Sequence, residues 1–381
     1  MGMHVLLRGD ILKVEKTITS FVLVDSNMKI ISEVLDFTYT LEQKGLSPNT
    51  VKSYLEDLKI FYLWLEKEKL KFYEVKPSDI PNFIEFLDNR RISGKVSPAT
   101  LNRYLATISS FFRHFEAMGG FIEESPMVKV KGYYPMEKRG YLRHISRNWD
   151  KNLNSYFRRK VRKKADRKLL QQDILQTFYK TISTLWSNDE SLKFRNQLIF
   201  RVLYETGYRV SELLHLKIND FDYPEPSSTV GNIYLIERHE PSLDRQLKTG
   251  ERTTPVSNSL LQAIDDYVLY HRPQVDDIDY IFVSHSTANY GKPLTRVAIE
   301  LIFNEIANAS EVKYFKLTPH ALRHTHASEL QNLGIDINVI KDRLGHSNIE
   351  TTSQYAKPSV ETLIKAHERY LNQKGGDVNF E

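Results

Sequence analysis

The helical periodicity of residues 29–118 constrains the fold more than any other feature of the sequence. Apolar residues in 30–41 recur at helical spacing. Two longer helices are predicted to start at Ser-Pro pairs, 47–48 and 97–98, because serine caps a free backbone N–H and proline suits the first helical turn. A shorter helix is expected within 77–91. Four helices in about 90 residues predict a compact all-α domain.

The C-terminal half predicts a larger mixed domain. Strands are expected at 232–237 and within 245–257, where the chain is predicted to turn at Thr249-Gly250. The predicted helices cover 169–187, 194–206, 259–272, 294–308, 319–333, 336–344 and 360–371. The expected fold class is therefore mainly α with a small β-hairpin region.

The length of 381 residues is enough for two domains. We expect an N-terminal extension at 1–26 with one or two short strands of uncertain attachment, a helical domain at 27–132, a basic linker at 133–168 and a larger domain at 169–381. The sequence contains no run of about 18 apolar residues, so no membrane span is predicted. The N-terminus lacks the apolar core of a signal peptide. The chain has no cysteine, which excludes disulfides and is consistent with a cytoplasmic protein.

Positive charge is concentrated between residues 138 and 168. This segment holds 13 lysines and arginines against two aspartates, a net charge of 13 − 2 = +11, whereas the whole chain carries +5. Aromatic residues are interleaved with the cations. A solvated linker is the alternative, but such a segment beside a helical domain favours contact with the backbone of a polyanion. The cations singled out as candidate DNA contacts are Arg158, Arg159, Arg162 and Lys163.

Two helices of the N-terminal domain place polar and basic residues near their starts. Lys52 follows the first Ser-Pro pair, and Arg103 follows the second. Helix N-termini bearing cations suit phosphate groups, so both residues are candidate DNA contacts. A solvated helix face remains the alternative interpretation.

Residues 317–356 combine histidines, arginines and a tyrosine, and a metal site is one interpretation. His320 and His324 are four residues apart, a usable ligand pair on a helix. Ala321, however, stands where a zinc-protease helix carries its glutamate, and Arg323 would set a permanent cation beside the metal. We therefore predict no metal site. Any one of these residues taken alone could also be structural.

A phosphate site accounts for more of these residues. Arginine matches two phosphate oxygens with its planar fork, and a tyrosine hydroxyl can attack phosphorus to form an ester. The stretch "TGYRVSELLHL" supplies a further arginine, Arg209, just after a glycine. Lys248 is the only lysine between Lys217 and Lys292, so it is the one lysine that the predicted β region can contribute.

Three motifs in order, "TGYRVSELLHL", "HALRHTHAS" and "LGHSNIETTSQYA", resemble those of the tyrosine recombinases, which include phage integrases, chromosome-dimer resolvases and tyrosine transposases. The resemblance covers about 205 residues of the C-terminal half. It extends more loosely to residues 29–126, which look like the helical, SAM-like core-binding domain of that family. It implies a core-binding domain joined to an α+β catalytic domain. The residues that it implies are catalytic are Arg209, Lys248, His320, Arg323, His346 and Tyr355.

The resemblance also implies the role of each catalytic residue. Tyr355 would be the nucleophile that takes the 3′-phosphate of DNA, Lys248 would protonate the leaving 5′-oxygen, and His320 would accept the tyrosine proton. Glu212 would support Arg209. The family matches His324 and His326 to noncatalytic positions, so both are predicted to be structural; Arg343 is predicted to be a charge on a helix face, with a phosphate contact as the alternative.

The function expected from this resemblance is site-specific recombination of double-stranded DNA by the integrase or transposase of a mobile element. No cofactor or metal is expected, because side-chain cations take the place of metal ions. Exchange between two duplexes implies a homotetramer on DNA, with helix 360–371 as a candidate contact between subunits; docking of this helix on its own domain is the alternative. The alternatives are a type IB topoisomerase-like enzyme and a catalytically silent DNA-binding regulator of the same fold.

Overall fold

The computed structural model divides the chain into two compact units, Met1–Lys164 and Ala165–Glu381. Each unit has a hydrophobic core of its own. The structure describes residues 12–18, 20–90, 94–119, 121–127, 129–131, 153–155, 157–161, 170–238, 250–312 and 314–345. The described part of the chain is mainly helical, which confirms the predicted fold class.

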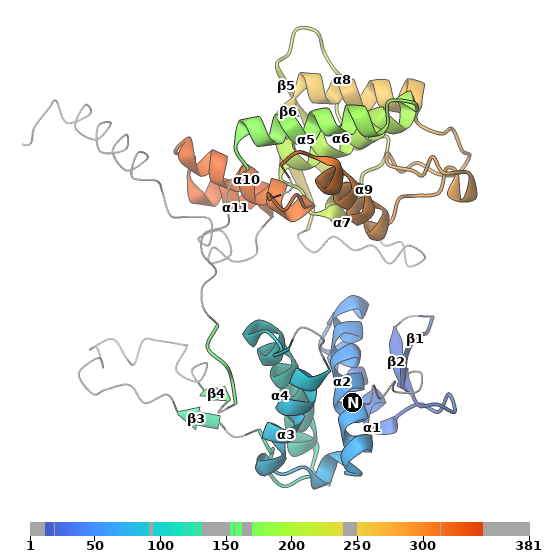
Figure 1. Ribbon diagram of the computed structural model, residues 1–381. Coiled ribbons are helices and arrows are strands. Elements are labelled where there is room, and N and C mark those ends of the chain that lie inside the picture. The colour runs from blue at the N-terminus through green and yellow to red at the C-terminus, as the bar shows by residue number, and fades with distance from the viewer. Residues whose placement is uncertain are drawn as a thin grey trace, which may run out of the picture. The chain divides into compact units, whose positions relative to one another are not determined.

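The first unit is built on helices whose starts the sequence predicted. They are α1 (Ser32–Gln43), α2 (Pro48–Glu68), the 3-10 turns Phe72–Glu74 and Pro77–Asp79, α3 (Ile80–Asn89) and α4 (Pro98–Met118) (Figure 1). Ser47 accepts a hydrogen bond from the backbone N–H of Thr50, and Ser97 accepts one from that of Thr100. Proline occupies the first turn of both helices, so both predicted Ser-Pro starts are confirmed.

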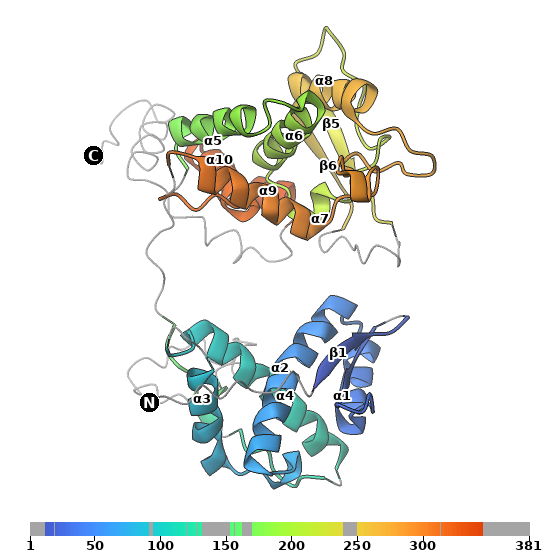
Figure 2. The ribbon, with the colours of Figure 1, turned by 45° about the vertical axis from the view of Figure 1, so that its right-hand side comes forward.

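Aromatic rings fill the core among α1, α2, α3 and α4, and α2 and α4 lie side by side in Figures 1 and 2. Phe61 meets Phe83 edge-on, with ring centroids 5.6 Å apart, and Phe37 meets Phe111 in the same way at 5.4 Å. Edge-to-face contacts of this kind add to the free energy gained from burial alone. The four-helix domain is therefore held by ring packing across its helices.

The N-terminal residues belong to this same core. Strands β1 (Lys13–Lys16) and β2 (Phe21–Val24) pair antiparallel, with Lys13 opposite Val24 and Lys16 opposite Phe21. Leu12, Phe21 and Leu23 are buried together with residues of α1 and α2. The two short strands, whose attachment was uncertain from the sequence, thus pack as a hairpin on the helices.

Part of the predicted basic linker also belongs to the first unit. Strand β3 (Lys129–Lys131) pairs antiparallel with β4 (Leu153–Ser155). The side-chain amide of Asn102 on α4 donates a 2.8 Å hydrogen bond to the carbonyl of Arg159 and accepts one of 3.0 Å from the N–H of Arg159. Residues 157–161 therefore lie against α4, while the other linker residues fall outside the described ranges except for β4.

The second unit gathers helices around a small antiparallel sheet. Its elements are α5 (Gln172–Leu185), α6 (Glu190–Thr206), α7 (Val210–Leu213), β5 (Val230–Leu235), β6 (Arg252–Ser257), α8 (Asn258–Asp266), the 3-10 turn Thr287–Asn289, α9 (Arg296–Ala309), α10 (Pro319–Asn332) and α11 (Ile337–Leu344). Helix α6 lies beside α5 and α10 (Figures 1 and 2). Its buried side chains, which include Leu198, Val202 and Leu203, are at the centre of the core.

The sheet of the second unit joins β5 to β6 over six residues, from Val230 opposite Ser257 to Leu235 opposite Arg252. The sequence predicted both strands, but placed the partner of β6 within the stretch 245–257. The described partner is β5, and Lys248 and Thr249 of the predicted turn lie outside the described residues.

Two local features of the second unit were not predicted. Helix α7 spans only four residues, too few to show a helical period. The helix predicted at 259–272 is α-helical to Asp266 and continues as a π-helix over Tyr267–His271. Its polar and aromatic pattern does not distinguish these two forms, since they differ by one residue per hydrogen-bonded turn.

Candidate active site

Helix α10 carries the predicted pair His320 and Arg323. Thr318 caps the helix by accepting a 3.0 Å hydrogen bond from the N–H of Ala321, and Pro319 occupies its first position. His320 is exposed at this end of the helix. Arg323 points into the unit, where its guanidinium donates to the carbonyls of Gly207 and Leu344, each at 2.7 Å. The pair thus combines an exposed imidazole with a buried cation.

Arg209 stands at the junction between α6 and α7. Helix α6 ends at Gly207 in the left-handed conformation, with φ of +67°, and Arg209 is the N-cap of α7. The N–H of Arg209 donates to Oε2 of Glu212 at 2.8 Å, and Nη1 donates to Oε1 at 3.1 Å. The same Nη1 lies 3.3 Å from the carbonyl oxygen of Leu344. The side chain of Arg209 is 31% exposed, so it remains partly open to solvent.

Glu212 is the shared partner of three arginines. Its side chain is 1% exposed, and it receives hydrogen bonds from Arg209 and from Arg252, whose Nη2 lies 2.9 Å from Oε2. Nη1 of Arg323 lies 3.8 Å from the same oxygen. The expectation that Glu212 supports Arg209 is confirmed. Three guanidiniums around one buried carboxylate leave an excess of positive charge, which suits a site that receives an anion.

The three arginines also hold the carboxyl end of α11. Arg209 and Arg323 donate to the carbonyl of Leu344, and Nε of Arg252 donates to the carbonyl of Arg343 at 3.0 Å. The last carbonyls of a helix have no intrahelical partner and are stabilised by cations. His346, the next residue but one after α11, lies outside the described residues, as do Lys248 and Tyr355.

Arg252 is the residue of this cluster that the sequence did not identify. It is the first residue of β6 and is 10% exposed at its side chain. The stretch "RQLKTGERTTPVS" contains this arginine together with Lys248, and its sequence does not distinguish Arg252 from the other arginine, Arg245. The chain brings β6 against α7 only through its tertiary fold, so no local pattern marks this arginine.

The prediction that Arg343 is a charge on a helix face was wrong. Its Nε donates to Nε2 of His326 at 3.0 Å, and its Nη2 donates to the carbonyl of Glu205 at 3.0 Å. Burial, with Arg343 and Arg323 nearby, lowers the pKa of His326 to about 3. A neutral His326 can accept this bond, which confirms its predicted structural role; His324 contacts Ser328 at 3.5 Å.

The predicted DNA contacts of the first unit are engaged in contacts within that unit. Arg103 forms an ion pair with buried Asp57, and Nζ of Lys52 lies 5.0 Å above the ring centroid of Phe21.

Nη2 of Arg159, in the basic segment, lies 2.9 Å from Oδ2 of Asp88, and the Arg159 guanidinium lowers the pKa of that carboxyl. Arg158 is exposed. Arg162 and Lys163 lie outside the described residues.

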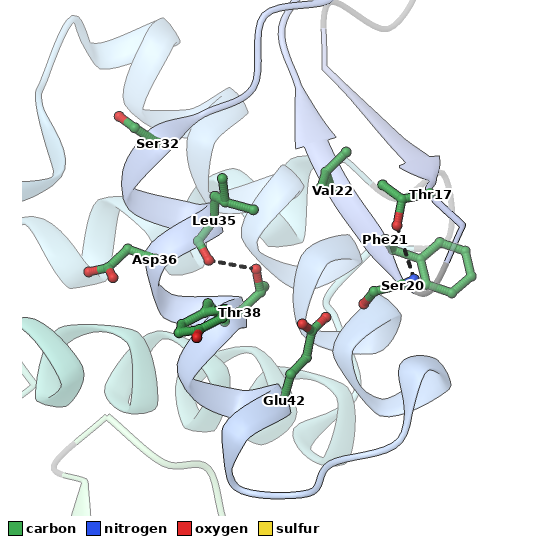
Figure 3. Close-up of a pocket in the computed structure, with 10 residues that line it drawn as sticks. Thr17, Ser20, Phe21, Val22, Ser32, Leu35, Asp36, Thr38 and Glu42 are labelled. Carbon is green, nitrogen blue, oxygen red and sulfur yellow. Dashed lines mark hydrogen bonds between the residues drawn. The ribbon is translucent and has the colours of Figure 1, made fainter.

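A hollow of about 500 Å³ in the first unit lies between the β1–β2 hairpin and α1 (Figure 3). The residues that line it include Asp36 and Glu42 and several hydroxyl side chains, but no lysine or arginine among those described. Carboxylates repel phosphate, so this hollow does not suit the DNA backbone.

Two kinds of feature are absent from the described residues. None of their helices is long and apolar enough to cross a membrane. Nor do three or more histidine or carboxylate side chains among them gather in a group that could hold a metal ion.

Comparisons with known proteins cover both units. Residues 168–362 match the model of the phage integrase family, and residues 35–118 match that of the phage integrase N-terminal SAM-like domain. The chain is 26% identical over 366 residues to transposase A from transposon Tn554 of Staphylococcus aureus, covering 93% of this chain and 95% of that protein. It is 29% identical over 325 residues to tyrosine recombinase XerD of Listeria monocytogenes, covering 83% and 90%.

Solved structures show the same fold. The XerH site-specific recombinase bound to its palindromic difH substrate superposes with a TM-score of 0.60 at 17% identity, covering 87% of this chain and 84% of that one. The integrase of transposon Tn1549, in complex with transposon right end DNA, gives a TM-score of 0.58 at 20% identity, covering 89% and 99%.

Proposed function

The chain belongs to the phage integrase family and is a tyrosine-type site-specific recombinase, and we propose that it moves a DNA element by cutting and rejoining the ends of that element. The match to transposase A of Tn554 supports this choice, because it spans 93% of this chain and 95% of that protein. The observation that carries the chemistry is the convergence of Arg209 and Arg323 on Glu212 and on the end of α11.

In this mechanism Tyr355 attacks the scissile phosphorus and takes the 3′-phosphate as a covalent ester. The pentavalent phosphorus gains negative charge on its nonbridging oxygens, where fixed donors stabilise it most. Arg209 is the partly exposed guanidinium and meets these oxygens directly. Arg323, at 3% exposure, adds positive charge from behind while it holds the backbone at Gly207 and Leu344.

Proton transfers fall to the other predicted residues. His320, exposed at the start of α10, accepts the proton of the Tyr355 hydroxyl. Lys248 protonates the departing 5′-oxygen, and His346 donates to a nonbridging oxygen. The energy of the phosphodiester is kept in the protein–DNA ester, so religation needs no nucleotide.

Exchange of strands between two duplexes needs four cleavages, and therefore four copies of Tyr355. We propose a homotetramer on DNA, with residues 360–371 as the contact between neighbours. The basic residues of 138–168 would add contacts with the DNA backbone.

The test uses labelled duplexes that carry the two ends of the element encoding this chain, each with a nick just beyond the expected cleavage position. A recombinase forms a covalent adduct on a denaturing gel and joins the two duplexes. Relaxation of supercoiled plasmid without joining would indicate the topoisomerase alternative, and binding without any adduct would indicate the regulator.

A further inference from the structure

Arg252 belongs to none of the three sequence motifs, yet it contacts several residues of the candidate site. Its Nη1 and Nη2 donate to the two oxygens of Glu212, at 3.3 Å and 2.9 Å, and its Nε donates to the carbonyl of Arg343 at 3.0 Å. The guanidinium carbon lies 5.1 Å from the ring centroid of Tyr208, within the range of a cation–π contact. Its edge and one of its faces are therefore both engaged.

These contacts fix the orientation of the Glu212 carboxylate. A carboxylate held by a two-pronged guanidinium cannot rotate freely about its terminal bond. Its Oε1 is then directed at Nη1 of Arg209, and its Oε2 at the N–H of Arg209. This carboxylate therefore restrains the partly exposed side chain of Arg209, together with the carbonyl of Leu344.

We propose that Arg252 is a positioning residue for the cleavage reaction. It sets the guanidinium of Arg209 through Glu212, and it ties β6 to the end of α11 through the carbonyl of Arg343. It does not touch the phosphate. The inference depends on the proposed function, in which Arg209 stabilises the charge on the scissile phosphate.

Only arginine has the donors that this role requires. A lysine at position 252 would keep the positive charge, but its single ammonium cannot hold both oxygens of Glu212 and the carbonyl of Arg343 at once. Arg252→Lys is therefore expected to behave much like Arg252→Met. A role that needed only the charge would instead be restored by lysine.

The experiment is a double-mutant cycle on the single-turnover rate of covalent adduct formation with a nicked duplex. The single variants are Arg252→Met, Arg252→Lys and Arg209→Ala. Each substitution at position 252 is also combined with Arg209→Ala in a double variant. If Arg209→Ala is too slow to measure, Arg209→Lys replaces it. We expect each substitution at 252 to slow the reaction roughly tenfold or more in the wild-type background. In the Arg209 variant the same substitution should slow it less than about threefold, because its target is already lost.

The matched control is Arg238→Met, because Arg238 also pairs with a buried carboxylate of the second unit, but with Asp220 rather than Glu212. It should leave the rate unchanged. DNA affinity and melting temperature are measured for every variant, and Arg252→Lys serves if Arg252→Met does not fold.

Each outcome gives a decision. An equal loss of rate in both backgrounds, full activity of Arg252→Lys, or an equal loss in Arg238→Met would overturn the positioning role. A normal rate in Arg209→Ala would instead overturn the catalytic role of Arg209, and with it the proposed chemistry of the site.

Discussion

Nε of Arg343 donates a 3.0 Å hydrogen bond to Nε2 of His326, and this bond joins α11 to the middle of α10. The acceptor nitrogen must be unprotonated, which agrees with the lowering of the His326 pKa to about 3 by burial and by the neighbouring arginines. The imidazole of His326 also packs closely against Gly207. A Cβ placed on Gly207 would lie 2.7 Å from Cδ2 of His326.

The first prediction concerns acid stability. The pKa of an unfolded histidine is near 6.5, whereas burial lowers the pKa of folded His326 to about 3. Between these values the unfolded chain binds the extra proton, so stability falls as pH falls. His326 should account for about 2 kcal/mol of the loss in unfolding free energy between pH 7 and pH 5. Urea unfolding at both pH values measures it, and His326→Gln should remove that share.

The control for this prediction is His285→Gln. Burial also lowers the pKa of His285, to about 4, but its partner is Tyr267, far along the chain from α10. That variant should retain the share that belongs to His326. An unchanged pH dependence in His326→Gln would contradict the assignment.

A second prediction uses two glycines with the same backbone conformation. Gly207 and Gly250 have φ of +67° and +70°, but of these two only Gly207 has atoms of the described residues within 4 Å of an added Cβ. Gly250→Ala should cost about 1–2 kcal/mol of unfolding free energy from backbone strain alone. Gly207→Ala should cost roughly 2–4 kcal/mol, because the methyl group also displaces His326 and Leu344. Equal costs in chemical denaturation would mean that the packing at Gly207 adjusts freely.

Much of this architecture could be read from local sequence. The Ser-Pro pairs at 47–48 and 97–98 start helices because capping depends only on neighbouring residues. Arg209, His320 and Arg323 were found because their motifs are short and ordered. Arg252 and Arg343 were not, since each acquires its partner from a distant segment, and charge alone does not distinguish a buried arginine from one on a solvated helix face.

The third prediction concerns the nucleophile. Tyr355→Phe removes one hydroxyl and keeps the ring, so DNA affinity should barely change while covalent adduct is lost. The measurement is a denaturing gel with labelled, nicked duplex, and slow nicking without ligation is the most that water attack could give. An adduct that survives in the variant would show that another of the 21 tyrosines is the nucleophile.

The fourth prediction concerns divalent metal. The proposed site works through Arg209, Lys248, His320, Arg323 and His346, whose cations take the part that metal ions play elsewhere. Single-turnover cleavage should therefore continue in excess EDTA at an unchanged rate. Loss of cleavage on chelation, restored by adding magnesium, would overturn this mechanism.

The fifth prediction separates the basic residues of 138–168 by their contacts. Replacing Arg158, Arg162 and Lys163 with glutamine should weaken binding to all DNA sequences alike and flatten the plot of log K against log salt by up to about 0.9 per lost phosphate contact. Arg159→Gln should mainly lower the melting temperature, because Arg159 bonds to Asp88 and Asn102. A salt slope that changes only in Arg159→Gln would reverse this assignment.

The carbonyls of Arg343 and Leu344 accept hydrogen bonds from the guanidiniums of Arg252, Arg209 and Arg323. These bonds have a consequence for unwanted DNA cleavage. The end of α11, after which the sequence continues to His346 and Tyr355, is hydrogen-bonded to these guanidiniums. Two of them, those of Arg209 and Arg323, belong to the proposed catalytic residues. If α11 shifts, the three arginines lose their hydrogen bonds to the carbonyls of Arg343 and Leu344. The position of the segment that leads to the proposed nucleophile changes with them. Under the proposed mechanism, a displacement of α11 would therefore disturb the nucleophile and the arginines together, and we expect a partly assembled site not to cleave DNA.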